Sequence, residues 1–329
     1  MWFESLTGFH EETADQVRAS IALDGETMTS TVNDREMVYG RLETPTLADL
    51  RSRAQDDDLP KGALRLSEVI GDVQQLHLQI ANAGGLFQVA SQFNLLEMVS
   101  ESVTPEHGVD IYENDRTQGP ACAIACGAGT IYRNYFAAVN GQVGQSSDNQ
   151  IDCLGDLADA LGNTDERLWA MRNGYALATA DGLREISQRL SSANESERDA
   201  LRQTLRIGIQ WNTQVTLGNA LHAVTQAYCS ALPVAYSPHS GILWADFAQL
   251  VLEASYEATL CAAILNRRCT GSNKLFLTLL GGGAFGNHGD WIFAAIERAL
   301  EQFADVPLDV SIVSYGSSKP RVRELVSRW

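Results

Sequence analysis

The residues best suited to chemistry are three consecutive glycines, Gly281, Gly282 and Gly283, which follow the short apolar run 275–280. Such a run is too short for a helix and is typical of a buried parallel strand. The amphipathic stretch 292–303 then predicts a helix. Glycine lets a ligand approach the backbone closely, and a helix N-terminus presents free N–H groups and a positive dipole end. The pattern therefore predicts a phosphate site, with a diphosphate as the expected ligand.

The same loop partly matches a dinucleotide-binding motif. Gly281, Gly283 and Gly286 give G-x-G-x-x-G between an expected strand and an expected helix. That fold needs an acidic residue roughly 20 positions further on to hold a ribose, whereas the next apolar run ends at Tyr315 with no carboxylate. A Walker A loop is excluded, because no Lys-Ser/Thr pair follows the glycines. A tight turn without any ligand is the structural alternative.

Composition and charge restrict the partners. The chain has 329 residues. Of these, 45% are hydrophobic and 20% are charged, which is the composition of an ordinary globular protein. Its formal net charge of −17 argues against nucleic acid as a partner. An anionic ligand must therefore be held by local backbone donors. No stretch approaches the ~20 apolar residues of a membrane span, and the acidic N-terminus does not resemble a signal peptide. We expect a cytoplasmic protein without a membrane partner.

The six cysteines and six histidines form no constellation that would hold a metal. No zinc-binding spacing of histidines or cysteines occurs. Cys122 and Cys126 form a CxxxC pair in an expected helix, and the other cysteines stand among apolar neighbours. We expect reduced, mostly buried thiols, no metal and no cofactor.

The order of elements predicts a layered α/β fold. We interpret 1–70 as an N-terminal extension, helical or irregular over 1–60, with an acidic, proline-containing break at 56–60. It would pack on a main domain spanning 71–329, with a helical insertion near 150–205. Strand candidates lie at 205–216 and 224–235, and a long amphipathic helix covers 247–265.

The C-terminal unit resembles the phosphate loop of macrodomains, in particular of their poly(ADP-ribose) glycohydrolase-like branch. The positions that carry this resemblance are Gly281, Gly283, Ala284, Phe285, Gly286 and, at the end of the following strand, Tyr315. The resemblance implies a macrodomain-like three-layer α/β/α sandwich with a mixed sheet and helical extensions. It also implies that the loop, from Gly282 through Phe285 to Asn287, wraps the diphosphate of ADP-ribose, with the aromatic ring on the adenosine side.

Two further segments, FQVASQFNLLEM and TQGPACAIACGAGTIYRNYF, look like the front half of a divergent macrodomain group that includes the MavL-type hydrolases. These remove ADP-ribose from arginine on a protein such as ubiquitin. By that resemblance Asn94 stands near the distal ribose, and Gln118 and Gly119 belong to a first phosphate-side loop that opens a helix. The chain lacks both the Asn-Ala-Ala-Asn signature of common macrodomains and the Gln-Glu-Glu triplet of poly(ADP-ribose) glycohydrolases. The resemblance therefore does not identify the catalytic carboxylate, and it gives no basis for predicting cleavage of poly(ADP-ribose).

Cleavage of a glycosidic bond passes through an oxocarbenium-like state that a carboxylate can stabilise or protonate. Glu97 lies three residues after Asn94, so on a helix the two would share a face; the alternative is a surface glutamate. Asp115 lies in a loop just before Gln118, where it would serve either catalysis or an Asx turn or helix cap. Asp148 lies in a polar loop, where it would otherwise cap a helix. These three carboxylates are the catalytic candidates.

The leading hypothesis is a hydrolase that removes ADP-ribose from a modified protein, with mono-ADP-ribosyl-arginine as the favoured linkage. A second hypothesis is a non-catalytic ADP-ribose reader, which would share the pocket but need no carboxylate near the ribose. A third is an NAD-dependent oxidoreductase, which would use the G-x-G-x-x-G match and prefer NAD to ADP-ribose.

Overall fold

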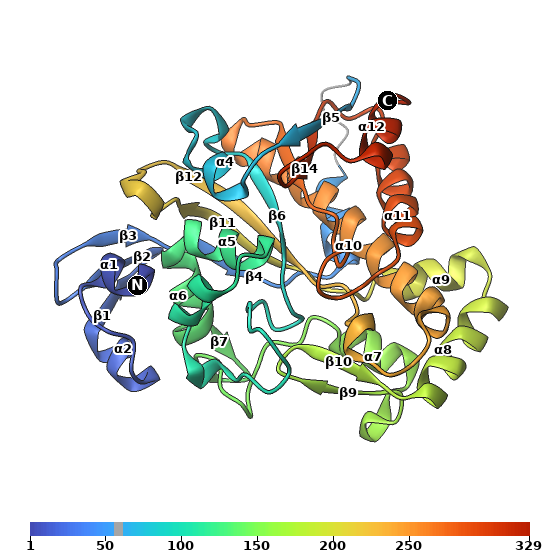
Figure 1. Cartoon of the computed structure of the whole chain (residues 1–329), viewed down its shortest axis with the longest axis horizontal. Helices are drawn as coiled ribbons and strands as arrows, with labels where there is room; N and C mark the ends of the chain where they lie inside the picture. The colour runs from blue at the N-terminus through green and yellow to red at the C-terminus, as the bar shows by residue number, and fades with distance from the viewer. Residues whose placement is uncertain (56–61) are drawn as a thin grey trace.

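The computed structural model of the chain describes residues 1–55 and 62–329 (Figure 1). The acidic break expected at 56–60 lies outside the described residues.

A seven-stranded mixed sheet forms the middle layer. Across the sheet the strands run in the order β4 (Arg41–Glu43), β11 (Gly208–Gln214), β12 (Ala223–Cys229), β6 (Leu86–Ala90), β13 (Lys274–Leu277), β14 (Asp309–Ser314) and β5 (Arg65–Ile70). The five strands from β12 to β5 pair in parallel, whereas β11 is antiparallel to both neighbours. The carboxyl ends of the five parallel strands therefore meet at one edge of the sheet, where ligands bind in open α/β folds.

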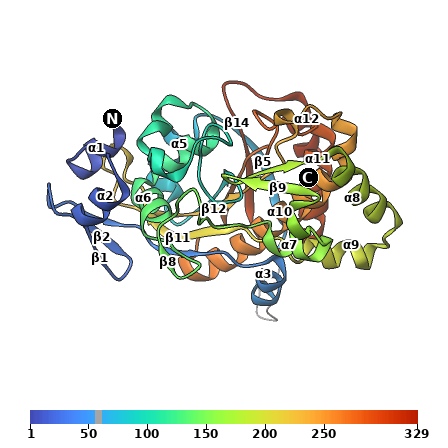
Figure 2. The same ribbon diagram turned by 90° about the horizontal axis from the view of Figure 1, so that it is seen from below.

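Helices cover both faces of the sheet (Figures 1 and 2). One layer consists of α10 (Gly241–Thr270) with α3 (Leu47–Ala54) and α11 (Gly289–Gln302) packed against it. The other layer consists of α4 (Val73–Leu78), α5 (Gln118–Ala125) and α6 (Gly127–Tyr135). This arrangement confirms the expected three-layer α/β/α sandwich with a mixed sheet.

Helix α10 is the central core helix of its layer. It is 30 residues long and ends at Thr270, and Gly271, with a φ of 77°, is its left-handed C-cap. Within the described residues it is the helix that by length and composition could cross a membrane, but 83% of its most apolar stretch is buried inside the protein. That burial is typical of a core helix.

The first 70 residues contribute both a separate unit and edge strands of the main sheet. Helices α1 (Trp2–Thr7) and α2 (Ala14–Ser20) pack with an antiparallel sheet of β1 (Ile21–Asp24), β2 (Thr27–Ser30) and β3 (Glu36–Val38). This unit lies beside α6, where Tyr39 stacks on Tyr132 with ring centroids 4.1 Å apart. The strands β4 and β5 are the two edges of the central sheet. The expectation of helical or irregular structure over 1–60 missed the strands β1 to β4.

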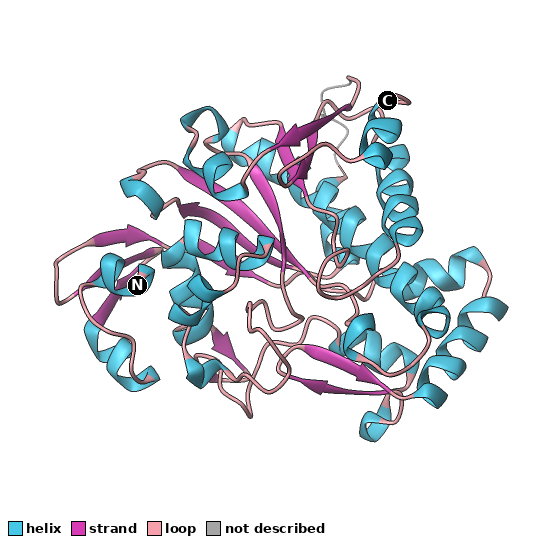
Figure 3. Ribbon diagram, viewed as in Figure 1, coloured by secondary structure: helices cyan, strands magenta, loops and turns pink. Residues whose placement is uncertain are grey.

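The region 150–205 is largely helical, as expected, but it also contains a β-hairpin (Figure 3). Its helices are α7 (Gly155–Leu161), α8 (Ala180–Ser192) and α9 (Glu195–Arg202). The hairpin pairs β9 (Trp169–Arg172) with β10 (Tyr175–Ala178) through Asn173 and Gly174, both with positive φ. The remaining elements are the short hairpin β7 (Ala138–Val139) and β8 (Gln142–Val143), α12 (Pro320–Val326), and the 3₁₀ turns η1 (Ile80–Asn82), η2 (Pro105–His107), η3 (Asp110–Asn114), η4 (Thr164–Glu166), η5 (Leu217–Asn219) and η6 (Val234–Tyr236).

Candidate active site

The loop after β13 has the shape that the glycines predict. Gly281 and Gly286 have φ values of +72° and +68°, and a Cβ on either would lie within 2.4 Å and 2.8 Å of Ala231 and Ala235, respectively. The amide of Asn287 closes the loop by donating to the Gly281 carbonyl at 2.9 Å. A side chain at these two glycines would therefore disturb the neighbouring loop after β12.

The middle of this loop is open. Gly282, Gly283 and Ala284 are exposed, and a Cβ on Gly283 would meet no atom within 4 Å. Within the described residues, the backbone N–H groups of Gly283, Ala284 and Phe285 donate to no protein acceptor. Helix α11 begins directly afterwards, with His288 as its N-cap. Free amides beside a helix N-terminus are suited to a phosphate group.

Phe285 is half-buried within an aromatic cluster. Its ring centroid lies 5.3 Å from that of Tyr175 in β10 and 5.6 Å from that of Tyr236 in the loop after β12. Asn287 is buried, and its side-chain amide donates to the Leu232 carbonyl at 2.7 Å. Tyr315, at the end of β14, is 76% exposed.

The segment after β6 is an irregular loop, so the expected helix through Asn94 and Glu97 is wrong. Leu95 has a φ of +66°, although it is buried. The Asn94 side chain is held within the protein, because its amide nitrogen donates to Gln150 at 2.9 Å and its oxygen accepts from the Leu96 amide at 3.1 Å. Asn94 therefore shapes this loop.

Glu97 is the buried carboxyl group of the site. It is 3% exposed, and its Oε1 has no hydrogen-bond partner within the described residues. Burial raises the pKa of Glu97 well above its usual value; nearby Arg133 opposes this shift and Asp115 adds to it. Its backbone amide donates to the Tyr112 hydroxyl at 3.0 Å. The protonated form of Glu97 therefore persists to a higher pH than for an exposed glutamate.

Helix α5 begins against this carboxyl group. A Cβ on Gly119 would lie 2.1 Å from both Oε2 of Glu97 and the Ala90 carbonyl oxygen. The Gln118 side chain accepts from the Ala90 amide at 2.9 Å and donates to the Gln88 carbonyl at 2.8 Å. Gln118 thus fastens the start of α5 to the end of β6.

Of the other two candidate carboxylates, Asp115 lies close enough to Glu97 for its charge to act on it. Its Oδ1 accepts from the Thr117 amide at 2.8 Å, which is an Asx turn. Asp148 is exposed in the turn from Ser146 to Asn149, and its side chain makes no hydrogen bond or ion pair in the described part of the chain. Of the three candidate carboxyl groups, Glu97 and Asp115 are thus the two whose charges interact.

Several residues of the site were not among the candidates predicted from the sequence. Arg133 is buried with its guanidinium 3.8 Å from the Tyr228 ring centroid, and it donates to the Leu95 carbonyl at 3.2 Å. Tyr175 and Tyr236 were also missed. The Asn173-Gly174 dipeptide, a strong hairpin signal, could have placed Tyr175 at the start of a strand.

Five of the six cysteines are buried free thiols, and Cys269 is exposed. In residues 1–55 and 62–329, no group of three His, Cys, Asp or Glu side chains is placed to hold a metal ion.

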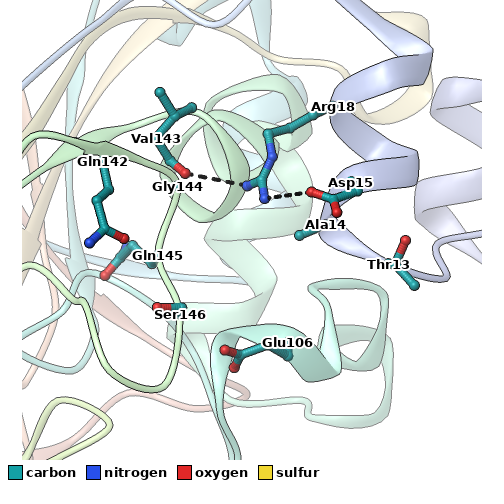
Figure 4. Close-up of a pocket in the computed structure, with 10 residues that line it drawn as sticks. All are labelled: Thr13, Ala14, Asp15, Arg18, Glu106, Gln142, Val143, Gly144, Gln145 and Ser146. Carbon is teal, nitrogen blue, oxygen red and sulfur yellow. Dashed lines mark hydrogen bonds and ion pairs between the residues drawn. The ribbon is translucent and has the colours of Figure 1, made fainter.

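A cavity of about 290 Å³ lies between α2 and the β7–β8 hairpin (Figure 4). Arg18 donates to the Val143 carbonyl and pairs with Asp15 there. None of its lining residues belongs to the glycine loop. Gln145 lines this cavity and donates to the Asn94 carbonyl at 3.0 Å. Through Gln145 the cavity wall is therefore joined to the loop that carries Glu97.

No protein-family model matches the sequence, and no curated protein matches it. Among solved structures, poly(ADP-ribose) glycohydrolase from Thermomonospora curvata, bound to the inhibitor ADP-HPD, is similar to this chain with a TM-score of 0.47 and 10% identity, covering 99% of both chains. A T267R mutant of the enzyme from Deinococcus radiodurans, in complex with ADP-ribose, gives a TM-score of 0.45 and 12% identity over 88% of this chain and 95% of that one. At these identities the likeness concerns the overall fold alone.

Proposed function

We propose that this protein hydrolyses the glycosidic bond between ADP-ribose and a protein side chain, with arginine as the favoured linkage and a ubiquitin-type protein as a possible substrate. The observation that carries this proposal is Glu97, a buried carboxyl group with a raised pKa and with one oxygen that has no hydrogen-bond partner in the described part of the chain. It lies at the carboxyl edge of the parallel strands, and the glycine loop follows the neighbouring strand. A carboxylic acid kept protonated by burial is suited to general acid catalysis.

In this scheme the glycine loop holds the diphosphate. The amides of Gly283, Ala284 and Phe285 donate to its oxygens, and the N-terminus of α11 favours its charge. These local donors are needed because the net charge of the chain is −17. The distal ribose then extends toward the loop after β6.

Glu97 provides the proton for bond cleavage. As the bond between ribose C1″ and the arginine nitrogen breaks, both bonding electrons stay on nitrogen, which takes the proton of Glu97. The Asp115 carboxylate, near Glu97, stabilises the positive charge that develops on the ribose. A water oxygen then bonds to C1″, and its proton returns to Glu97. The products are ADP-ribose and an unmodified arginine.

Calorimetric titration with ADP-ribose tests the binding site, with NAD and AMP as competing ligands. The variant Gly283→Glu adds a negative charge where a side chain meets no atom within 4 Å, so it should fold normally and lose binding. Preference for NAD would favour the oxidoreductase hypothesis instead, and no heat with any nucleotide would overturn the proposal.

Release of ADP-ribose from an arginine-modified protein tests the chemistry. Binding without release would identify a non-catalytic reader.

A further inference from the structure

A second cavity, of about 140 Å³, lies beside the aromatic cluster of the site. Strand β10, the loop after β12, the N-terminal part of α10 and Glu101 enclose it. The lining residues are Glu101, Ala176, Leu177, Ala178, Pro233, Tyr236, Ser237, Pro238 and Trp244.

The cavity adjoins the proposed reaction centre through two tyrosines. Tyr236 lines the cavity and also packs against Phe285 of the glycine loop and against Tyr175, 5.2 Å away. The Tyr175 hydroxyl donates at 2.7 Å to the carbonyl of Met98, the residue after Glu97. The charges of Glu97 and Glu101 both contribute to raising the pKa of Tyr175, after the larger effect of burial.

The walls of the cavity match a planar cation. The Glu101 side chain makes no ion pair or hydrogen bond within the described residues, so its carboxylate is free to pair with a ligand. Tyr236, which is 37% exposed, supplies an aromatic ring, on which a guanidinium group stacks better than an ammonium group does. The remaining walls are mainly apolar and would contact an aliphatic chain.

We propose that this cavity is the subsite for the arginine side chain from which ADP-ribose is removed, with Glu101 pairing with its guanidinium group. This inference rests on the proposed hydrolase function and specifies its substrate class. A neutral linkage, such as one to serine, would leave the Glu101 charge without a partner. The cavity therefore explains how a site that holds ADP-ribose through its glycine loop would select the modified side chain.

The test compares Glu101→Gln with wild type on arginine-linked ADP-ribosyl ubiquitin and on a serine-linked ADP-ribosyl peptide. We expect KM for the arginine-linked substrate to rise about tenfold or more, because the variant loses the charged pair between Glu101 and the guanidinium group. ADP-ribose affinity, measured by calorimetry, should stay unchanged. N-acetyl-arginine methylamide should compete with the arginine-linked substrate on the wild-type enzyme and do so much more weakly on the variant. Glu301→Gln, the same change at an exposed position of α11, is the matched control.

A Glu101→Gln enzyme that behaves like Glu301→Gln would overturn the subsite, as would an equal rise in KM for the serine-linked peptide. A wild-type enzyme that cleaves only the serine linkage would also overturn it, while leaving the hydrolase function intact. A wild-type protein that binds ADP-ribose but cleaves neither substrate would overturn the hydrolase proposal together with this one.

Discussion

Gly119 and Glu97 are in such close contact that a Cβ at Gly119 would lie 2.1 Å from Oε2 of Glu97. The same carbon would lie 2.1 Å from the Ala90 carbonyl oxygen. The start of α5, the end of β6 and the proposed catalytic acid therefore meet at a point where only glycine fits. Because Gln118 ties this helix start to β6, the contact has little freedom to open.

We expect Gly119→Ala to destabilise the fold by about 1–3 kcal/mol, the usual effect of overpacking, and to displace the Glu97 carboxyl group. Urea denaturation measures the first effect and ADP-ribose release the second. The control is Gly283→Ala, whose added methyl group meets no atom within 4 Å and should leave stability almost unchanged. Equal stability of the two variants would contradict the close packing at Gly119.

Glu97→Gln should abolish most hydrolysis while retaining ADP-ribose binding. The amide has nearly the same shape but cannot donate an acidic proton, and loss of a general acid typically costs about 10²–10⁴-fold in rate. Single-turnover release of ADP-ribose measures the rate, and calorimetry measures the affinity. Asp148→Asn, at an exposed position, is the matched control and should act as wild type. Full activity of Glu97→Gln would remove Glu97 from the mechanism.

Much of the fold could be predicted from local sequence pattern. The strand-loop-helix-strand unit at the C-terminus, the strands β11 and β12 and the long helix α10 all lie where the apolar periodicity indicates. Most residues of β11, β12 and α10 are buried, which is the environment that their apolar residues indicate. The Asn-Gly dipeptide at 173–174 marked a hairpin that the helical interpretation of 150–205 overlooked, and the one at 140–141 marked a second hairpin outside that region.

The loop after β6 could not be predicted locally, because distant residues determine its shape. Leu95 adopts a positive φ, and a Cβ on Gly208, in β11, would lie only 2.3 Å from its side chain. Asn94 pairs with Gln150, which is 56 positions away in the chain. A helical pattern in the residues themselves is therefore overridden by tertiary contacts. For the same reason the sequence did not show that Glu97 is buried.

The raised pKa of Glu97 predicts a specific pH dependence of stability. The folded state holds the proton of Glu97 above the pH at which the unfolded chain releases it, so the stabilising effect is complete below the unfolded pKa near 4.5. It is lost as pH rises through the folded pKa, with a slope of at most about 1.4 kcal/mol per pH unit. We expect the free energy of unfolding of wild type to fall with pH relative to that of Glu97→Gln. Parallel pH profiles for the two proteins, from urea denaturation, would show that the carboxyl group is not desolvated.

A buried ion cluster away from the site should govern global stability. Glu257 of α10 is 3% exposed and pairs with Arg51 of α3 and, at 2.7 Å, with Arg298 of α11. Its carboxylate thus joins three helices of one layer. Removing one partner of a buried pair leaves the other charges uncompensated and typically costs about 3–5 kcal/mol. We therefore expect Glu257→Ala to lower the free energy of unfolding by that amount.

The matched control for this cluster is Glu185→Ala, which breaks the exposed pair with Arg167 at 2.6 Å. Exposed pairs contribute about 0–1 kcal/mol, because water screens them and two long side chains must be ordered. Urea denaturation of both variants measures the difference. If the two losses were equal and small, the charges around Glu257 would be compensated by Arg51 pairing with Asp199 at 2.7 Å, and α10 would owe its position to apolar packing alone.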